Sequence, residues 1–169
     1  MRNHLIKKYI IGYNGKNSFL ANSFIKTYKK NFIFKCYSGD INNYSKFSNW
    51  IQKNQKLNYF INFAAITEPN KCNNNKKKAL KTNFISLKKN IEIINNSKLN
   101  NFQYFLFISS SHVFKNSLKK LNENSKKKPL NYYGKTKLLS EIYILKNKNK
   151  FTFKLGIARI FNYYNRDSN

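Results

Sequence analysis

Two side chains that could exchange protons stand four residues apart in the second half of the sequence. Tyr133 and Lys137 belong to the segment YGKTK, and the spacing of apolar residues predicts a helix over residues 132–148, which places both on one helix face. A phenol has an ordinary pKa of about 10, and a nearby positive charge favours its ionised form. The chain contains 12 Tyr and 30 Lys, so random placement alone gives about two such pairs. The pair therefore needs support from its surroundings.

Small and polar residues stand where other apolar segments end. Ser110 follows a predicted strand over residues 103–109, and Ala64 and Ala65 end another over residues 58–65. The two alanines would admit a flat ring or a ribose. Because ligands bind at the carboxyl ends of parallel strands, a site is expected at these ends.

A turn of small residues follows the first predicted strand, residues 8–14. Its sequence GKNSFLA, residues 15–21, has the pattern Gly-x-x-Ser-x-x-Ala and leads into a predicted helix over residues 18–29. Small residues permit a tight turn, and a helix N-terminus favours a pyrophosphate. A register that begins at Gly12 competes with this one, and an ordinary strand-to-helix turn is the alternative to a phosphate site. We prefer the register from Gly15 because it places apolar residues on the buried face of the helix: Phe19, Leu20, Phe24 and Ile25.

Strand and helix segments alternate along the rest of the chain. Further strands are predicted over residues 32–37 and 153–160, and further helices over residues 44–53 and 74–97. Strands that alternate with helices imply a parallel sheet covered on both faces. We therefore expect one doubly wound α/β domain over residues 1–169. The apolar pattern predicts that the buried face of the helix over residues 132–148 consists of Leu138, Leu139, Ile142 and Leu145.

Composition argues against several classes of protein. Two cysteines, two histidines and six scattered acidic residues are too few for a disulfide framework, a metal cluster or paired-carboxylate chemistry. Neither a membrane-spanning run nor a secretory signal is recognisable, so we expect a cytoplasmic protein without membrane insertion. The net charge of +27 reflects 30 Lys against 3 Arg, alongside 30 Asn. Because arginine is the residue of bidentate base and phosphate recognition, we attribute the charge to compositional drift and expect no specific nucleic-acid partner.

The motifs, taken in order, resemble one known family. The strand-end serine, the segment YGKTKLLSE and the closing segment RIFN together resemble the extended short-chain dehydrogenase/reductases of the NAD-dependent epimerase/dehydratase superfamily. The segments FAAITEPNKC and ENSKKKPLNYYGKTKLLSE are most similar to dTDP-4-dehydrorhamnose reductases, whereas RIFNYYN is more similar to epimerases and dehydratases. The resemblance implies a Rossmann-type, NAD(P)-binding fold and reduction of a 4-keto nucleotide sugar in cell-surface polysaccharide synthesis. A nucleotide-sugar epimerase or dehydratase is the alternative.

The resemblance also implies roles for individual residues. Tyr133 would be the general acid/base, Lys137 would support it and bind the nicotinamide ribose, and Ser110 would hold the substrate oxygen. A nucleotide sugar is the implied partner, and a homodimer is compatible with the family. Residues expected around the cofactor, besides Tyr133 and Lys137, are Gly15, Ser18, Phe19, Leu20, Asp40, Ile41, Ala64, Ala65 and Asn83.

The sequence also departs from the family pattern. Ser18 stands where glycine is usual and should crowd the pyrophosphate. No acidic residue ends the strand over residues 32–37, so the usual acceptor for the ribose 2′-hydroxyl is missing, and Lys16 or Lys35 would tolerate a 2′-phosphate. We therefore expect NADP or NAD as cofactor, with NADP favoured.

Length is the largest departure. The C-terminal part that binds the nucleotide sugar in the family is largely missing, so the chain alone is expected to bind cofactor with little turnover. The remaining alternatives are a truncated, non-catalytic NAD(P)-binding protein and a basic nucleic-acid-binding protein.

Overall fold

The computed structural model describes residues 8–117 and 120–161, which contain a five-stranded sheet of order β2-β1-β3-β4-β5. The strands span Ile10–Asn14 (β1), Ile33–Tyr37 (β2), Tyr59–Asn62 (β3), Tyr104–Ser110 (β4) and Lys154–Ile160 (β5). All neighbouring strands are parallel. The chain order reverses at β1, because β2 lies on one side of it and the later strands lie on the other. Ligands bind beyond the carboxyl ends of the strands at such a switch point.

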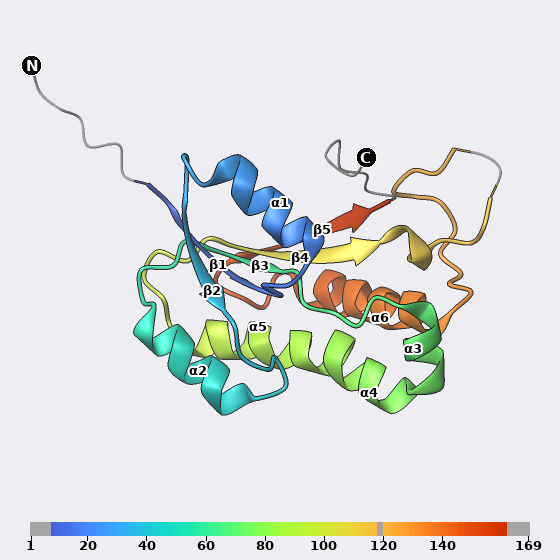
Figure 1. Ribbon diagram of the computed structural model, residues 1–169, viewed down its shortest axis with the longest axis horizontal. Helices are drawn as coiled ribbons and strands as arrows, with labels where there is room; N and C mark the ends of the chain where they lie inside the picture. Colours follow the sequence, from blue (N-terminus) through green and yellow to red (C-terminus); the bar gives the residue numbers. More distant parts are fainter. Residues whose placement is uncertain (1–7, 118–119, 162–169) are drawn as a thin grey trace, which may run out of the picture.

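Helices lie on both faces of the sheet. They span Phe19–Tyr28 (α1), Tyr44–Lys53 (α2), Pro69–Asn74 (α3), Lys76–Leu80 (α4), Ser86–Asn96 (α5) and Tyr132–Asn147 (α6). Helix α1 lies on one face, and α2, α5 and α6 lie on the other (Figure 1). The doubly wound parallel sheet predicted from the sequence is thus confirmed. Within residues 8–117 and 120–161, no helix is long and apolar enough to cross a membrane.

The core consists of two layers, because alternate residues of a strand face opposite sides of the sheet. On the α1 side, Ile11 and Ile61 pack with Ala21 of the helix. On the other side, the fully buried rings of Phe60 and Phe105 stack with centroids 5.5 Å apart. Burying one such side chain stabilises the fold by about 1.5–3 kcal/mol. The two layers hold β1, β3 and β4 in the centre of the sheet, with their carboxyl ends at the same edge.

The predicted helix over residues 74–97 is interrupted in the structure. A π-helical turn, Lys81–Ile85, separates α4 from α5. The turn contains Asn83, whose Oδ1 accepts from the Ile66 N–H (2.8 Å) and whose Nδ2 donates to the Ile66 carbonyl (3.0 Å). A π turn lets one residue leave the regular helical spacing, which here brings an amide to the chain that follows β3. The preceding helix α3 has no counterpart among the predicted elements.

The predicted buried face of α6 is wrong at three of its four residues, and the fourth, Leu138, is half-buried. Leu139, Ile142 and Leu145 are 41%, 40% and 52% exposed. Polar groups on the opposite face bond to neighbouring elements; for example, the Ser140 hydroxyl donates to the Asn83 carbonyl (3.1 Å). These bonds, and not the apolar pattern, set the rotation of the helix. Its buried residues are Tyr133, Gly134, Thr136, Lys137, Ser140, Glu141 and Ile144.

Asn90 of α5 is fully buried, and neither its amide nitrogen nor its amide oxygen has a hydrogen-bond partner among the described residues. An unpaired buried polar group costs about 1–3 kcal/mol. We predict that Asn90→Leu raises the free energy of unfolding, measured in urea, by about 1–2 kcal/mol. Asn96→Leu, at an exposed position of the same helix, should change it by less than about 0.5 kcal/mol. A destabilised Asn90→Leu variant would contradict the prediction.

Candidate functional site

A hollow of about 700 Å³ lies at the carboxyl ends of β1 and β3, where the strand order reverses. Eight of the residues that the sequence places around a cofactor line it: Gly15, Ser18, Phe19, Leu20, Asp40, Ile41, Ala64 and Ala65. Phe19 is 53% exposed, so its expected place on the buried face of α1 is wrong, and it lies at the rim of the hollow instead. The structure therefore brings together segments that follow β1, β2 and β3.

Gly15, the first residue of the pattern Gly-x-x-Ser-x-x-Ala, lies in the turn that follows β1. Gly15 has a φ of +76°, and a Cβ atom there would lie 2.8 Å from the Ala64 nitrogen. A side chain is excluded at this position both by the left-handed backbone and by the neighbouring chain. Ser18 is the N-cap of α1 and accepts from the Ala21 N–H (3.3 Å). The fully buried Ala21 then lets the helix approach the sheet closely.

Two asparagines with no role predicted from the sequence, Asn14 and Asn62, lie at the ends of β1 and β3 next to this hollow. The buried Asn14 donates to the Asn62 side chain (2.8 Å), and its own oxygen accepts from the Ala64 N–H (2.9 Å). These bonds fix the ends of β1 and β3 against the chain that follows β3. A polar residue at the last position of an otherwise apolar strand was the signal available in the sequence.

Asp40 lines this hollow, and its carboxylate is hydrogen-bonded to Asn42. Its Oδ1 accepts from the backbone N–H (2.9 Å) and the side chain (3.0 Å) of Asn42. The backbone bond from Asn42 is the main cause that lowers its pKa. Lys16 lines the same hollow, whereas Lys35 lines a separate one with Ile10 and Ile33. Of the two lysines expected near a 2′-phosphate, Lys16 lines the first hollow and Lys35 does not.

A second, smaller hollow of about 290 Å³ contains Ser110, Tyr133 and Lys137. The residues Ser18, Leu20, Phe63 and Thr67 line both this hollow and the first. The two hollows are therefore contiguous, and a long ligand could occupy both.

Lys137 is buried and unlike the many surface lysines. Its Nζ donates to the Ile108 carbonyl (2.8 Å) and lies 4.8 Å from the centre of the Phe107 ring and 5.7 Å from that of Tyr133. Burial lowers the pKa of Lys137 to about 7, against the opposing charge effects of Cys72 and Glu141. The group can therefore gain or lose a proton near neutral pH.

Tyr133 and Ser110 form the other part of this hollow. Burial raises the pKa of Tyr133, and a hydrogen bond with Ser110 acts in the opposite direction. The Ser110 Oγ also accepts from the His112 N–H (3.3 Å). The Ser110 hydroxyl, the Tyr133 phenol and the Lys137 ammonium thus lie in the same hollow. Together these groups can hold a substrate oxygen atom and exchange a proton with it.

Asn83, the remaining residue expected at the cofactor, lines neither hollow. It is buried, and its Nδ2 donates to the Thr136 hydroxyl (3.0 Å) as well as to Ile66. Since its Oδ1 accepts from Ile66, both amide protons and the oxygen are already bonded. Asn83 thus connects Ile66, which lines the first hollow, to Thr136 of α6 without lining the hollow itself.

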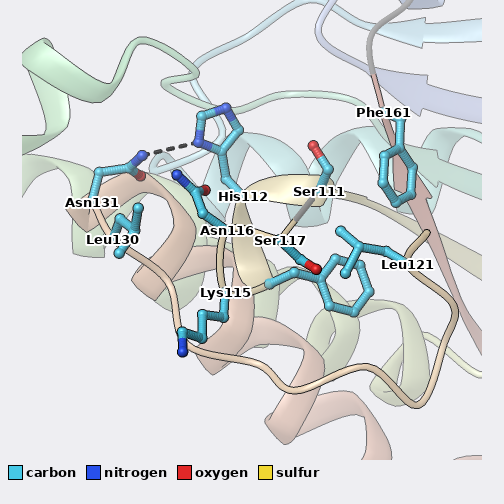
Figure 2. Close-up of a pocket in the computed structure, with 10 residues that line it drawn as sticks. Ser111, His112, Lys115, Asn116, Ser117, Leu121, Leu130, Asn131 and Phe161 are labelled. Carbon is cyan, nitrogen blue, oxygen red and sulfur yellow. Dashed lines mark hydrogen bonds between the residues drawn. The ribbon is translucent and has the colours of Figure 1, made fainter. Parts of the chain in front are cut away.

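A third hollow, of about 800 Å³, lies next to the second one, and His112, Asn131 and Phe161 are among the residues that line it (Figure 2). Asn131, the N-cap of α6, accepts from the Gly134 N–H through Oδ1 (2.8 Å). Its Nδ2 is thereby turned toward His112 and donates to Nδ1 (2.9 Å). Phe161 and His112 line this hollow and the second one, so the three hollows form a series. Asn162, the last residue of the RIFN segment, lies outside the described residues.

The comparisons with known proteins give the family. The family profile described as "NAD dependent epimerase/dehydratase family" matches residues 12–168, most of the chain. The chain belongs to this family. No curated protein matches the chain in sequence.

Several solved structures share the fold. A dTDP-4-dehydrorhamnose reductase from Clostridium acetobutylicum is 28% identical with a TM-score of 0.74, covering 89% of this chain and 52% of that one. A dTDP-4-dehydrorhamnose reductase from Bacillus anthracis, in complex with NADP, is 20% identical with a TM-score of 0.77, and the match covers 94% of this chain and 56% of that one. A UDP-glucose 4-epimerase from Brucella ovis, in complex with NAD, is 17% identical with a TM-score of 0.81, and the match covers 91% of this chain and 52% of that one. The chain thus spans about half the length of these structures.

The buried ammonium of Lys137 makes stability depend on pH. The folded state releases its proton at about pH 7, whereas the unfolded chain holds it up to 10.5. The unfolded state therefore binds more protons between these values, and stability rises with pH. We predict that the free energy of unfolding rises by roughly 1–2 kcal/mol more between pH 7 and pH 9 in the wild type than in Lys137→Met. Parallel pH profiles from urea titrations of the two proteins would contradict this.

Proposed function

We propose that the chain is the cofactor-binding and catalytic part of an NAD(P)-dependent nucleotide-sugar oxidoreductase. One observation carries the proposal: the hollow at the Gly15 turn is continuous with the hollow that contains Ser110, Tyr133 and Lys137. A dinucleotide that extends through both would have its pyrophosphate at the start of α1 and its other end beside Tyr133. Membership of the NAD dependent epimerase/dehydratase family supports the same reading.

The residues present fit a dinucleotide. The close approach of Gly15 to Ala64 leaves backbone where a side chain would obstruct a phosphate, and the N-terminus of α1 favours negative charge. Asp40 and Ile41 would contact the adenine, and Lys137 would bind the ribose nearest the reacting ring. When bound, the nicotinamide supplies the hydride donor or acceptor. The Bacillus and Brucella structures, crystallised with NADP and NAD, support this class of cofactor.

Tyr133, Ser110 and Lys137 would together transfer a proton to the substrate oxygen and stabilise the groups that take part. In the reductive direction, the phenol of Tyr133 donates its proton to the ketone oxygen while the carbonyl carbon receives hydride. Ser110 donates a hydrogen bond to the same oxygen and holds it beside Tyr133. The ammonium of Lys137 stabilises the phenolate that remains. The raised pKa of the buried phenol keeps Tyr133 protonated before the reaction, as a proton donor requires.

We favour reduction of a 4-keto nucleotide sugar of the dTDP-4-dehydrorhamnose type as the reaction. The Clostridium reductase has the highest identity of the three structures compared, at 28%, which supports this choice. The second candidate is a nucleotide-sugar epimerase, favoured by the TM-score of 0.81 with the Brucella 4-epimerase. The third hollow, with His112, Asn131 and Phe161, would receive part of the sugar nucleotide in either case.

Cofactor binding tests the proposal directly. We predict saturable binding of NADPH, measured by nucleotide fluorescence at salt high enough to screen the exposed lysines. Lys137→Ala should raise the Kd about tenfold, equivalent to about 1.4 kcal/mol, because the buried ammonium is lost. Lys135→Ala, at an exposed position of the same helix, is the matched control and should bind like the wild type. Absence of binding at millimolar NADPH would overturn the proposed function.

Lys16 provides a test of cofactor preference that needs no nicotinamide. We predict that 2′,5′-ADP binds about two- to fivefold more tightly than 5′-ADP, the size expected of an exposed charge contact, when the two are compared by calorimetry. Lys16→Gln should abolish the difference, whereas Lys35→Gln, which alters the separate hollow, should preserve it. Equal affinities in the wild type would assign the chain to NAD.

A further inference from the structure

Glu141 is a fully buried carboxylate that continues the face of α6 on which Tyr133 and Lys137 lie, one helical turn further on. Its Oε1 accepts from the Ser109 hydroxyl (2.6 Å) and from Nε of Arg159 (2.8 Å), and its Oε2 accepts from Nη2 of Arg159 (2.9 Å). A buried carboxylate is tolerated when it is paired and fully hydrogen-bonded. Arg159, on β5, supplies the opposite charge, and two nitrogens of its planar guanidinium donate hydrogen bonds to the carboxylate.

Three successive residues at the end of β4 are each contacted by one residue of this helix face. Lys137 binds the Ile108 carbonyl, Glu141 binds the Ser109 hydroxyl, and Tyr133 lies beside Ser110 in the second hollow. Neighbouring residues of a strand point to opposite faces. Holding Ser109 against α6 therefore fixes the direction in which Ser110 points, and a slip of one residue would exchange the two.

Arg159 also reaches the chain between β4 and α6. Its Nη1 donates to the Glu123 carbonyl (3.3 Å), and its guanidinium carbon lies 5.1 Å from the centre of the Phe114 ring. Phe114 in turn stacks on Phe161, with centroids 6.2 Å apart. Both rings line the third hollow. Arg159 thus contacts both Phe114, which lines the third hollow, and Glu141, which bonds to the end of β4.

We propose that Glu141 and Arg159 are a positioning pair for the site. Glu141 aligns the end of β4 so that Ser110 meets Tyr133, and Arg159 links this alignment to the wall of the third hollow through Glu123. Neither residue lines the hollow that contains Ser110, so both act through other residues. The role in catalysis rests on the proposed function, whereas the mechanical link between Glu123, Arg159 and β4 does not.

Amide hydrogen exchange in the free chain tests the mechanical link. Arg159→Lys keeps the positive charge, but an ammonium cannot reproduce the fork that joins Glu141 and Glu123. We expect exchange in residues 120–126 to rise about tenfold in this variant, with exchange in α2 unchanged. The matched control is Glu92→Gln, which removes the exposed Lys89–Glu92 pair (3.1 Å) and should alter neither region.

Cofactor affinity tests the positioning of the site. Glu141→Gln removes the charge but keeps the shape of the side chain, and we expect exchange at residues 109–113 to increase and the Kd for NADPH to rise about tenfold. Ser109→Ala removes the bond between β4 and Glu141, and it also removes a hydroxyl from the lining of the second hollow. It should increase exchange at residues 109–113 and raise the Kd in smaller measure, and it is the variant to use if Glu141→Gln does not fold. The Glu92→Gln control should bind NADPH like the wild type.

The outcomes separate the two proposals. Wild-type chain that binds no NADPH overturns the proposed function, and the exchange results then decide the mechanical link alone. Binding by the wild type with an unchanged Kd in both Glu141→Gln and Ser109→Ala overturns the positioning role. Exchange that rises equally throughout the chain in Arg159→Lys would mean that the pair contributes stability only.

Discussion

The buried ammonium of Lys137 shapes the structure around the site. The ammonium of Lys137 is held against the sheet by the Ile108 carbonyl, and burial costs it so much that its pKa falls to about 7. A charge in this position needs compensation from its neighbours. Glu141 lies one turn further along the helix, and Arg159 balances Glu141. The buried ionic groups of α6 and β5 therefore form one arrangement, and the end of β4 lies within it.

This arrangement explains the rotation of α6. The helix turns its polar residues inward, where Ser140 and Thr136 bond to the π turn of the neighbouring helix, and leaves Leu139 and Ile142 exposed. An ordinary surface helix buries its apolar stripe. The usual preference is reversed because each inward polar group has a specific partner, and an unpaired polar group in the same place would be costly.

The first hollow, at the carboxyl ends of β1 and β3, depends on a different constraint, the order of the strands. Because β1 lies between β2 and β3, the chains that leave their carboxyl ends diverge and leave space between them. The side chains of Asn14 and Asn62 bond to each other, and the Asn14 oxygen accepts from the Ala64 N–H. These bonds tie the ends of β1 and β3 to a residue that lines the hollow. Gly15 then allows the turn to approach Ala64 closely. The hollow is thus a property of the sheet, and the side chains refine it.

The sequence by itself determined the parallel α/β fold, the strand positions and the presence of a small-residue turn after the first strand. These depend on local period and on small residues at fixed positions, which are written in the chain order. It also named Ser110, Tyr133 and Lys137, which the structure brings into one hollow. Tertiary structure alone decided the rotation of α6, the π turn at Asn83 and the pairing of Glu141 with Arg159. Those features arise from polar contacts between residues far apart in the chain, whose partners no local pattern specifies.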